Sequence, residues 1–367
     1  MRRWTKMMQK TIIVAIAALV LSAVSQSASA QVVPNGSFDE GVTTPTGWQL
    51  SGGVGTWEKE GRTADSRCIS VTGDGKSSNY WKCPSVVLEP GKIYRINFWT
   101  KSSPDAGGEF VITGNPSCNF DWGHANKWTH RATTAKVPPY RPEQQFIRFG
   151  QWHATGKVYF DDIGVTEVQA VHLPVGRASF SEGERIWNNQ YEFVMPLKQG
   201  INIARPLAEC TAPFDTDRWR LTGDARLVFR HEVSDMKGPA YRLSGGRVKT
   251  SVIHWARGLC VVEASRDGET WTHLGQIDKD GAAEFRLPDE FEDSTVVLVR
   301  LYGEKKEDEK RDPSLQVDGY MFSATLDHQT LMNITGKTQF LPARPPASQK
   351  RPEDEDDKGR GAPADKQ

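Results

Sequence analysis

Short segments in which apolar and polar residues alternate recur along most of the chain, separated by Gly, Pro, Asn and Asp. Alternation with a period of two places successive side chains on opposite faces of a β-strand. These segments are RCISV (67–71), YWKCPSVVL (80–88), KIYRINFWTK (92–101), EFVIT (109–113), QFIRFGQW (145–152), KVYFDDIGVTEV (157–168), ARLVFRHEV (225–233), GRVKTSVIHW (246–255), LCVVEAS (259–265), STVVLVRLYG (294–303) and LQVDGYMFSATL (315–326). The pattern predicts an all-β protein with two antiparallel β-sandwiches in tandem.

The N-terminal residues follow a different pattern. Residues 1–10 hold four basic side chains, an apolar run (TIIVAIAALVLSAV) fills 11–24, and Ala28-Ser29-Ala30 follows. An apolar run of this length is too short to span a bilayer but suits the core of a signal peptide, and A-x-A is a cleavage pattern. We therefore predict a cleaved signal peptide at 1–30 and a secreted or periplasmic protein.

The end of the chain lacks the alternating pattern. Residues 341–367 (LPARPPASQKRPEDEDDKGRGAPADKQ) hold few apolar residues, much Pro, and six basic against six acidic side chains. Such a segment cannot bury enough apolar surface to offset its chain entropy. We expect the following order: a first sandwich at 31–168, a linker at 169–174 (QAVHLP), a second sandwich at 175–335 and a disordered tail at 336–367.

The charge balance limits the kinds of partner. The chain carries 46 basic and 46 acidic residues, and removal of 1–30, which holds four basic and no acidic residues, leaves 42 against 46. Binding to many nucleic-acid phosphates needs a concentrated excess of Lys and Arg, so such a partner is not expected. Residues 31–168 hold 14 basic and 14 acidic residues, and this neutral balance favours an uncharged sugar over a charged partner.

Export permits disulfides, and the chain has five cysteines: Cys68, Cys83, Cys118, Cys210 and Cys260. Cys68 and Cys83 flank a turn-rich stretch, TGDGKSSN (72–79), as facing residues of a hairpin would. We predict a Cys68–Cys83 bridge, with Cys83–Cys118 as its rival. Cys210–Cys260 is the pairing that the second sandwich offers, and one thiol remains over.

Strand alternation also indicates a candidate binding face in the first sandwich. In IYRINFW (93–99) the apolar side chains face one way, whereas Arg95, Asn97 and Trp99 face the other. In FIRFGQW (146–152), Arg148 and Trp152 are predicted to point outward in the same manner. Sugar rings stack on aromatic rings, while their hydroxyls need planar polar partners, so this combination is typical of a glycan site.

Other Trp residues of the first sandwich extend this prediction. Trp57, Trp81 and Trp122 are expected in or near loops that could rim a cleft, whereas Trp48 and Trp128 are expected to fill the core or cover its ends. Trp122 belongs to NPSCNFDWGHANKW (115–128), a predicted loop rich in aromatic and polar residues that suits a recognition edge. The predicted ligand-binding residues are Trp57, Trp81, Arg95, Asn97, Trp99, Trp122, Arg148 and Trp152.

Several motifs of the first sandwich resemble those of a known family. NGSFDEG (35–41), GW at 47–48, LEPGKIYRINFWTK (88–101), IRFG (147–150) and VYFDDIGVTEV (158–168) resemble the cenC-type carbohydrate-binding modules found beside cellulases and xylanases. The resemblance implies a jelly-roll, galactose-binding-like fold and a polysaccharide ligand. It also implies a structural calcium between the first strand and the last, which points to Asp39 with Asp161 or Asp162, because calcium prefers such oxygen donors.

A second resemblance concerns the second sandwich. CVVEASRDGETWTHLGQI (260–277) resembles the strand–turn–strand of discoidin-like, galactose-binding domains. Asp267-Gly268 would supply a positive-φ turn, with Trp271 packed across it. This resemblance concerns the fold alone and implies no site residues.

Enzymatic activity is one alternative function. A glycosidase needs two carboxylates at a fixed separation, one of them with a raised pKa. The carboxylates considered are Glu182, Glu184, Asp215, Asp217, Glu232 and Asp235, and none lies in a recognisable catalytic motif. We therefore predict a secreted non-catalytic protein that binds a polysaccharide or glycoconjugate, with no organic cofactor and no membrane insertion. The alternatives are a divergent hydrolase that acts on glycosyl bonds, and an envelope or matrix adhesion protein with a cell-surface partner.

Overall fold

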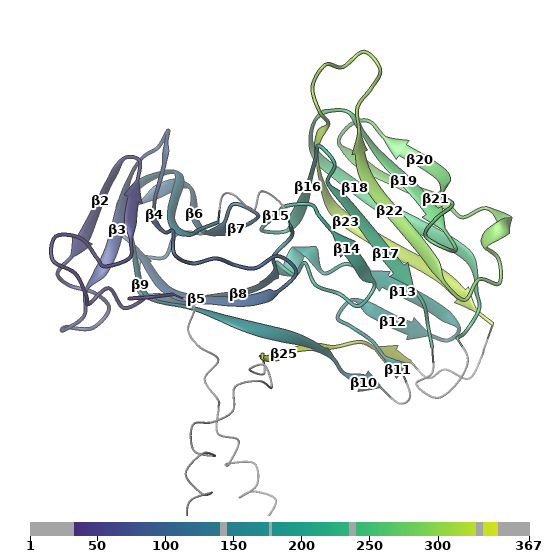
Figure 1. Ribbon diagram of the computed structural model, residues 1–367, viewed down its shortest axis with the longest axis horizontal. Coiled ribbons are helices and arrows are strands. Elements are labelled where there is room, and N and C mark those ends of the chain that lie inside the picture. Colours follow the sequence, from purple (N-terminus) through teal and green to yellow (C-terminus); the bar gives the residue numbers. More distant parts are fainter. Residues whose placement is uncertain (1–32, 140–144, 176–177, 235–239, 328–332, 344–367) are drawn as a thin grey trace, which may run out of the picture. The chain divides into compact units, whose positions relative to one another are not determined.

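The structure is a computed structural model that describes residues 33–139, 145–175, 178–234, 240–327 and 333–343 (Figure 1). The predicted signal peptide and residues 344–367 of the predicted tail lie outside the described residues. The described part contains β-strands and two short 3-10 helices, η2 (Leu197–Gln199) and η3 (Asp289–Phe291), which confirms the predicted all-β class. No helix in it is long and apolar enough to cross a membrane. Residues 31–343 form one compact unit.

The first sandwich contains β1 (Gln49–Ser51), β2 (Val54–Glu58), β3 (Cys68–Asp74), β4 (Ser78–Cys83), β5 (Ile93–Ser102), β6 (Gly107–Asn115), β7 (Cys118–Trp122), β8 (Thr129–Lys136) and β9 (Ile147–His172). One of its sheets has the order β2–β3–β9–β5–β8. The other has the order β1–β4–β9–β6–β7. Strand β9 belongs to both sheets: residues 147–152 pair with β4, and residues 155–160 pair with β3.

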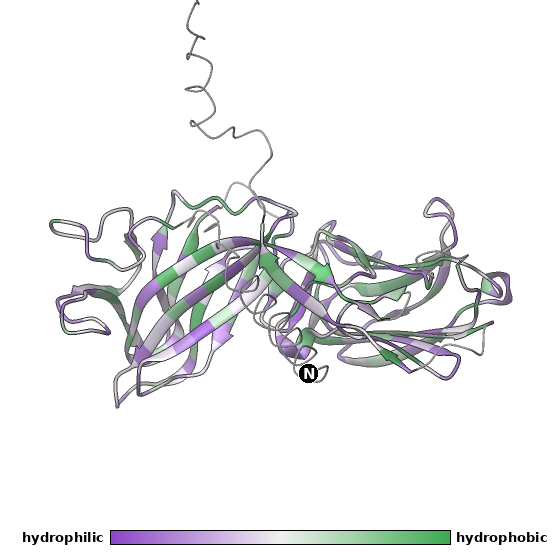
Figure 2. Ribbon diagram, turned by 90° about the horizontal axis from the view of Figure 1, so that it is seen from below, coloured by the Kyte–Doolittle hydropathy of each residue, from purple (hydrophilic) through white to green (hydrophobic). Residues whose placement is uncertain are grey.

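Alternation along β5 confirms the predicted strand phase. Tyr94, Ile96 and Phe98 are buried in the core of the first sandwich, whereas Arg95 is exposed. Figure 2 shows the same alternation of hydrophobic and hydrophilic positions along many strands. Because each sheet has one apolar face, the two sheets pack with these faces together.

The second sandwich contains β12 (Glu184–Trp187), β13 (Gln190–Val194), β14 (Leu207–Cys210), β15 (Phe214–Asp215), β16 (Arg218–Thr222), β17 (Arg226–His231), β18 (Leu243–Arg257), β19 (Leu259–Ser265), β20 (Thr272–Ile277), β21 (Gly281–Arg286), β22 (Val297–Glu304), β23 (Ser314–Leu326) and β24 (Ile334–Thr335). A small hairpin, β10 (Pro174–Val175) and β11 (Ala178–Ser179), precedes it. One sheet has the order β14–β17–β22–β19–β20. In the other, β23 pairs with β13, β16 and β18, while β12, β24 and β21 extend the edges.

Stacked rings join the two sheets of the second sandwich. Phe229 on β17 stacks on Tyr320 on β23 with 3.7 Å between ring centroids, and His231 stacks on Phe322 at 3.8 Å. All four side chains are buried. Each stacked pair bridges the interior, so the core combines apolar burial with oriented aromatic contacts.

The hairpin between β19 and β20 has the predicted turn. Gly268 has a φ of +83°, a conformation that glycine adopts without strain. The Oδ1 atom of Asp267 accepts hydrogen bonds from the Glu269 and Thr270 amides at 2.8 and 2.9 Å, and Trp271 Nε1 donates to the Gly268 carbonyl oxygen at 3.1 Å. The predicted positive-φ turn with Trp271 across it is therefore confirmed.

The segment between the sandwiches differs from the prediction. Strand β9 continues through residues 169–172, and these residues pair antiparallel with β25 (Thr338–Pro342). This corrects the prediction of a linker at 169–174 and of a disordered tail that begins at 336, because residues 169–172 and 338–342 are paired strands. Neither segment has a strong strand pattern of its own, and each obtains its backbone hydrogen bonds from the other, about 170 positions away; β-propensity depends on such context.

The sandwiches share a ladder and a core. Strand β7 pairs in parallel with β15, with Cys118 opposite Phe214 and Asn119 opposite Asp215. Phe120 packs edge-to-face on Phe214 with 6.1 Å between ring centroids, and both lie in the hydrophobic cluster of the second sandwich. Residues of the first sandwich therefore help to complete the core of the second.

The disulfide predictions are wrong, because all five cysteines are free thiols. Cys210 on β14 and Cys260 on β19 are separated by β17 and β22, which places their backbones about 14 Å apart. A disulfide requires Cα atoms within about 7 Å. Cys83 on β4 and Cys118 on β7 are likewise separated by β9 and β6. Cys68 lies on β3, which belongs to the other sheet from β4.

Candidate functional site

The outer face of the β1–β4–β9–β6–β7 sheet carries a row of residues that continues into the second sandwich. Figure 1 shows β15 beside β7, where this continuation occurs. The row follows the ladder register, in which Arg148 is opposite Gly114, Gly114 is opposite Asn119, Asn119 is opposite Asp215, and Asp215 is opposite Arg218. Opposed residues on neighbouring strands project from the same face, so these polar side chains share one surface.

Asn119 connects the Arg148 guanidinium of this row to the carboxylate of Asp121, which lies two residues further along β7. Arg148 Nη2 donates to Asn119 Oδ1 at 2.9 Å, and Asn119 Nδ2 donates to Asp121 Oδ1 at 2.8 Å. The Thr216 hydroxyl donates to Asp121 Oδ2 at 2.9 Å. These hydrogen bonds cross from one sandwich to the other and fix the orientation of the side chains.

Gly114 lies between Arg148 and Asn119 in the ladder. Its φ is +102°, and a β-carbon there would lie 2.1 Å from the carbonyl oxygen of Cys118. Two strand spacings separate the backbones of Arg148 and Asn119 by about 10 Å. A long arginine side chain can span this distance because Gly114 has no side chain to obstruct it.

Two aromatic side chains lie exposed beside the polar row. Trp152 on β9 and Phe110 on β6 are ladder partners, and they are 47% and 43% exposed. The Trp152 ring also stacks on His153 with 4.4 Å between centroids, which favours one orientation of the indole. Adjacent rings in solvent form a surface on which the flat face of a ligand can stack.

The second sandwich supplies a wall of ion pairs. Asp215 Oδ2 lies 2.9 Å from Arg220 Nε, and Arg218 Nη1 lies 3.0 Å from Asp217 Oδ1. Arg218 Nε also donates to Gln316 Oε1 at 2.6 Å. These contacts hold the arginine side chains against the wall.

The polar side chains and the two exposed aromatic rings of the first sandwich form the floor of a groove, and the ion-paired residues of the second sandwich form its wall. The groove has a volume of about 430 Å³. The groove is lined by Phe110, Ile112, Pro116, Asn119, Asp121, Arg148, Trp152, Asp215, Arg218 and Arg220. Burial raises the pKa of the Asp215 carboxyl, and the Arg220 and Arg218 guanidinium groups oppose that shift. Burial lowers the pKa of the Arg148 guanidinium. Both shifts have the direction expected for side chains partly shielded from water, where charges interact more strongly than at an open surface.

Two of the predicted ligand-binding residues, Arg148 and Trp152, lie in this groove with the predicted outward orientation. Arg95, Asn97 and Trp99 lie on β5 in the other sheet of the first sandwich. The structure therefore separates the predicted residues into two groups instead of one face.

The Trp99 face differs from the groove. The guanidinium carbon of Arg62 lies 4.9 Å from the centroid of the Trp99 ring, and the His130 ring lies at 5.3 Å. Trp99 and Asn97 are half-buried. These neighbours cover the indole that the prediction assigned to a ligand.

Trp81 and Trp122 require correction. Trp81 is 3% exposed and donates from Nε1 to the Ser70 carbonyl oxygen at 2.9 Å, so it is a core residue. Trp122 lies on β7 instead of in a loop, donates from Nε1 to Thr113 Oγ1 at 2.8 Å and packs edge-to-face on Phe98. Trp81 is therefore unable to line a cleft, and the half-buried Trp122 does not line the groove.

The other Trp residues of the first sandwich have mixed outcomes. Trp48 is buried, as predicted. Trp57 on β2 donates from Nε1 to the Phe38 carbonyl oxygen at 2.8 Å, and the Arg67 guanidinium covers its ring at 3.5 Å. Trp128 is half-buried and packs edge-to-face on Tyr159. None of the three lines the groove.

Sequence reasoning missed four of the polar and aromatic groove residues: Phe110, Asn119, Arg218 and Arg220. Phe110 belongs to an alternating strand, EFVIT (109–113), in which its outward phase is visible. Asn119 and Asp121 belong to NPSCNFDWGHANKW (115–128), which is predicted to be a recognition loop, whereas the structure places these two residues on strand β7. The two arginines carry no local signal, because their role depends on the β7–β15 ladder.

The predicted calcium position contains carboxylates that already have donors. Asp161 is buried, and its Oδ2 accepts from the Arg62 amide at 2.7 Å. The Arg62 side chain pairs with Asp162 at 2.7 Å, and Asp39 Oδ1 accepts from the Arg67 amide at 3.2 Å. Within the described ranges, no three carboxylate, His or Cys residues cluster around a common point. A calcium ion requires six or more oxygen ligands, whereas these carboxylates are engaged by backbone amides and by the Arg62 guanidinium. Calcium binding at this position stays a prediction.

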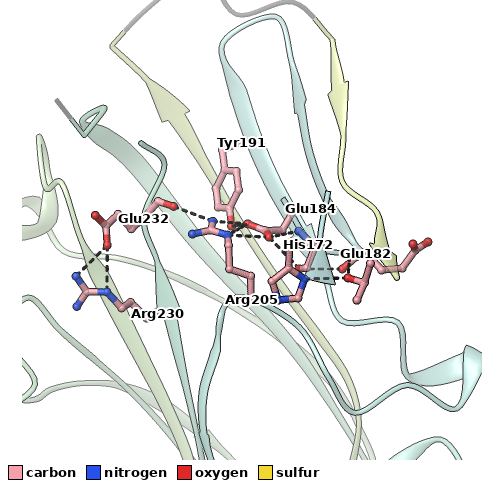
Figure 3. Close-up of polar contacts among 9 residues, drawn as sticks. His172, Glu182, Glu184, Tyr191, Arg205, Arg230 and Glu232 are labelled. Atoms are coloured by element: carbon pink, nitrogen blue, oxygen red, sulfur yellow. Dashed lines mark hydrogen bonds and ion pairs between the residues drawn. The ribbon is translucent and has the colours of Figure 1, made fainter. Parts of the chain in front are cut away.

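A second polar cluster lies inside the second sandwich (Figure 3). Glu184 accepts hydrogen bonds from Arg205 Nε at 3.0 and 3.1 Å and from the Tyr191 hydroxyl at 2.9 Å. Arg205 Nη2 donates to the Glu232 carbonyl oxygen at 2.8 Å. Glu184 and Tyr191 are fully buried, so the carboxylate is inaccessible to a polymer. This cluster compensates a buried charge and serves the fold.

No family model and no curated protein matches this chain. One solved structure that the comparison with this chain returns is the N-terminal CBM22-1–CBM22-2 tandem domain of Xyn10C from Paenibacillus barcinonensis (14% identity, 83% of this chain, 100% of that chain, TM-score 0.31). The enzymatically active domain of tailspike protein 4 of bacteriophage CBA120 matches at 15% identity over 37% of this chain and 21% of its own length, with a TM-score of 0.30.

The ANX1 ectodomain of Arabidopsis thaliana matches at 8% identity over 76% of this chain and 90% of its own length, with a TM-score of 0.24. Several of the similar structures are carbohydrate-binding modules. At these identities and TM-scores the likeness assigns no function to this chain.

Proposed function

We propose that the protein is exported and binds a polysaccharide or glycoconjugate in the groove without cleaving it. The observation that carries this proposal is the exposed Trp152–Phe110 pair beside the hydrogen-bonded row of Arg148, Asn119 and Asp121. A sugar presents a flat C–H face to aromatic rings and hydroxyl groups to planar polar side chains. The groove offers both kinds of contact on one floor.

The contacts of the groove carboxylates favour binding over cleavage. Asp121 accepts hydrogen bonds from Thr216 and Asn119, and Asp215 is paired with Arg220. A glycosidase needs one carboxyl group that donates its proton and a second that acts as a base or nucleophile. Both groove carboxylates are instead already engaged by donors of the protein.

Export is supported by the sequence of residues 1–30, with its basic start, apolar core and Ala28-Ser29-Ala30 site. A polymer outside the cytoplasm is then the natural ligand. The adhesion alternative requires a protein partner at the surface, and no exposed feature of the described residues favours it over a sugar.

Affinity electrophoresis of residues 31–367 in gels that contain soluble polysaccharides tests the proposal. We expect retardation by at least one polymer, and we expect Trp152→Ala and Phe110→Ala each to weaken it by about tenfold, the effect of losing about 1.4 kcal/mol of stacking. Trp187→Ala is the matched control, because Trp187 is 63% exposed on β12 and lies outside the groove. Thermal unfolding of each variant establishes that it is folded.

Two results would contradict the proposal. The first is the absence of retardation by every polymer in the panel while the protein is folded. The second is loss of retardation in Trp187→Ala together with normal retardation in Trp152→Ala. Release of reducing ends from a bound polymer would support the hydrolase alternative and overturn the non-catalytic part.

A further inference from the structure

The arginines of the groove differ in how their charges are compensated. The groove is lined by three arginines, Arg148, Arg218 and Arg220, and by the aspartates Asp121 and Asp215. Arg220 is paired with Asp215 at 2.9 Å, and Arg218 is paired with Asp217 at 3.0 Å. Both wall arginines therefore have a carboxylate partner within the protein.

Arg148 has no such partner among the residues that the structure describes. Within the described part of the chain it forms no ion pair, and its Nη2 donates to the neutral amide oxygen of Asn119. Its Nε atom is buried there without a hydrogen-bond partner, and its guanidinium carbon lies 5.4 Å from the centroid of the Tyr80 ring. The nearest carboxylate in the hydrogen-bond chain, Asp121, is reached only through the Asn119 amide. A half-buried cation without a direct counter-ion is incompletely compensated.

The distance between Arg148 and Trp152 along β9 sets the minimum length of a ligand that contacts both. Arg148 and Trp152 project from the same face of β9 and are four residues apart, which corresponds to about 13 Å along an extended strand. A ligand that stacks on Trp152 and reaches Arg148 is therefore longer than one sugar ring. A chain of sugar units along β9 satisfies this geometry.

We infer that the ligand of the groove is an acidic polysaccharide, one of whose carboxylates binds Arg148 while a neighbouring sugar ring stacks on Trp152. This inference rests on the proposed function and names its ligand class. The guanidinium fork matches the planar carboxylate of a uronic acid and forms charge-assisted hydrogen bonds with it. The carboxylate supplies a counter-ion that the described residues do not place in direct contact with Arg148, whereas the hydroxyl of a neutral sugar does not.

Paired polymers test the inference. Residues 31–367 are run in affinity gels with polygalacturonate, alginate and hyaluronan, and with the same three polymers after reduction of their carboxylates to alcohols. A hydrogen bond to a charged group contributes about 1.5–3 kcal/mol, so we expect at least one acidic polymer to bind about tenfold or more tightly than its reduced form. We expect Arg148→Gln to abolish this difference.

Controls separate the inference from the proposed function. Arg185→Gln is the matched variant, because Arg185 is exposed on β12 outside the groove, and it should keep the full preference. Trp152→Ala should weaken binding of the acidic and reduced polymers alike. If Arg148→Gln does not fold, added salt replaces it: salt should weaken binding of the acidic polymer and leave the reduced polymer unaffected.

The outcomes are distinguishable. Equal binding of every acidic polymer and its reduced form overturns the inference and leaves carbohydrate binding intact. A preference that persists in folded Arg148→Gln also overturns it. Failure of all six polymers and of a neutral panel overturns the proposed function itself.

Discussion

Arg148 Nη2 donates a hydrogen bond to Asn119 Oδ1 at 2.9 Å, although strand β6 lies between their two strands. The contact exists because position 114 of β6 is a glycine, over which the arginine side chain extends. Asn119 is held in turn by Asp121, which the Thr216 hydroxyl orients. The polar floor of the groove therefore depends both on the absence of a side chain at Gly114 and on the pairing of β7 with β15, which connects the two sandwiches.

Gly114→Ala should destabilise the protein. A β-carbon at this position would lie 2.1 Å from the Cys118 carbonyl oxygen, and the φ of +102° disfavours any side chain. Strain of this kind costs about 1–3 kcal/mol, and the displaced backbone also moves Asn119 out of reach of Arg148. We expect a lower midpoint of chemical unfolding and weaker glycan retardation. Gly123→Ala is the control, because a β-carbon there meets nothing within 4 Å. Equal stability of the two variants would contradict the steric argument.

Trp99→Ala should leave glycan retardation within about twofold of the unsubstituted protein, the scale of a substitution away from the site. Trp99 lies on β5, outside the groove, with Arg62 and His130 against its ring. Affinity electrophoresis beside Trp152→Ala provides the comparison. If Trp99→Ala abolished retardation and Trp152→Ala did not, the binding face would be the β5 surface that the sequence predicts.

Strand phase could be predicted from the sequence because it depends only on local alternation. The outward orientation of Arg148 and Trp152 follows from FIRFGQW (146–152) alone. The two sandwiches follow from the number and spacing of such segments. The sequence does not decide which face of a strand is buried where both faces carry aromatic residues. Tyr80 and Trp81 are adjacent on β4 and point to opposite faces, and only the packed core determines that Trp81 is the buried one.

The rest of the site depends on contacts between distant parts of the chain. The hydrogen bonds between Asp121 and Thr216 join residues 95 positions apart, and no local pattern predicts the parallel pairing of β7 with β15. Cysteine spacing failed for the same reason, because the order of strands in the sheets decides which thiols approach each other. The equal numbers of basic and acidic residues in 31–168 describe the net charge of the whole first sandwich, whereas a ligand in the groove contacts the local charge around Arg148. The net charge therefore does not predict the charge of the ligand.

Arg205→Ala should destabilise the protein by about 3–5 kcal/mol, the usual cost of leaving a buried charge without its partner. Glu184, which Arg205 contacts through two nitrogen atoms, is fully buried. Arg226→Ala is the control, because Arg226 forms a solvent-exposed pair with Glu209, and such pairs contribute about 0–1 kcal/mol. Urea unfolding of both variants measures the difference. Similar losses in the two variants would show that the buried cluster is no more important than a surface pair.

His231 should make folding stability depend on pH. Its ring is buried against Phe322, its Nε2 lies 2.7 Å from the Tyr320 hydroxyl, and burial followed by the charge of Arg205 lowers its pKa well below the usual range. The unfolded chain takes up a proton on this residue below about pH 6.5, whereas the folded protein does not. Stability contributed by neutral His231 is therefore complete above that pH and is lost as the pH falls toward the folded pKa, by at most about 1.4 kcal/mol per pH unit. Burial also lowers the pKa of His172, which adds a change of the same sign.

Urea unfolding between about pH 8 and pH 5 measures this dependence. The decline in stability should be shallower in His231→Gln than in the unsubstituted protein, once the stability that the substitution itself costs at about pH 8 is subtracted. An unchanged slope would mean that His231 accepts a proton in the folded state as readily as in the unfolded chain.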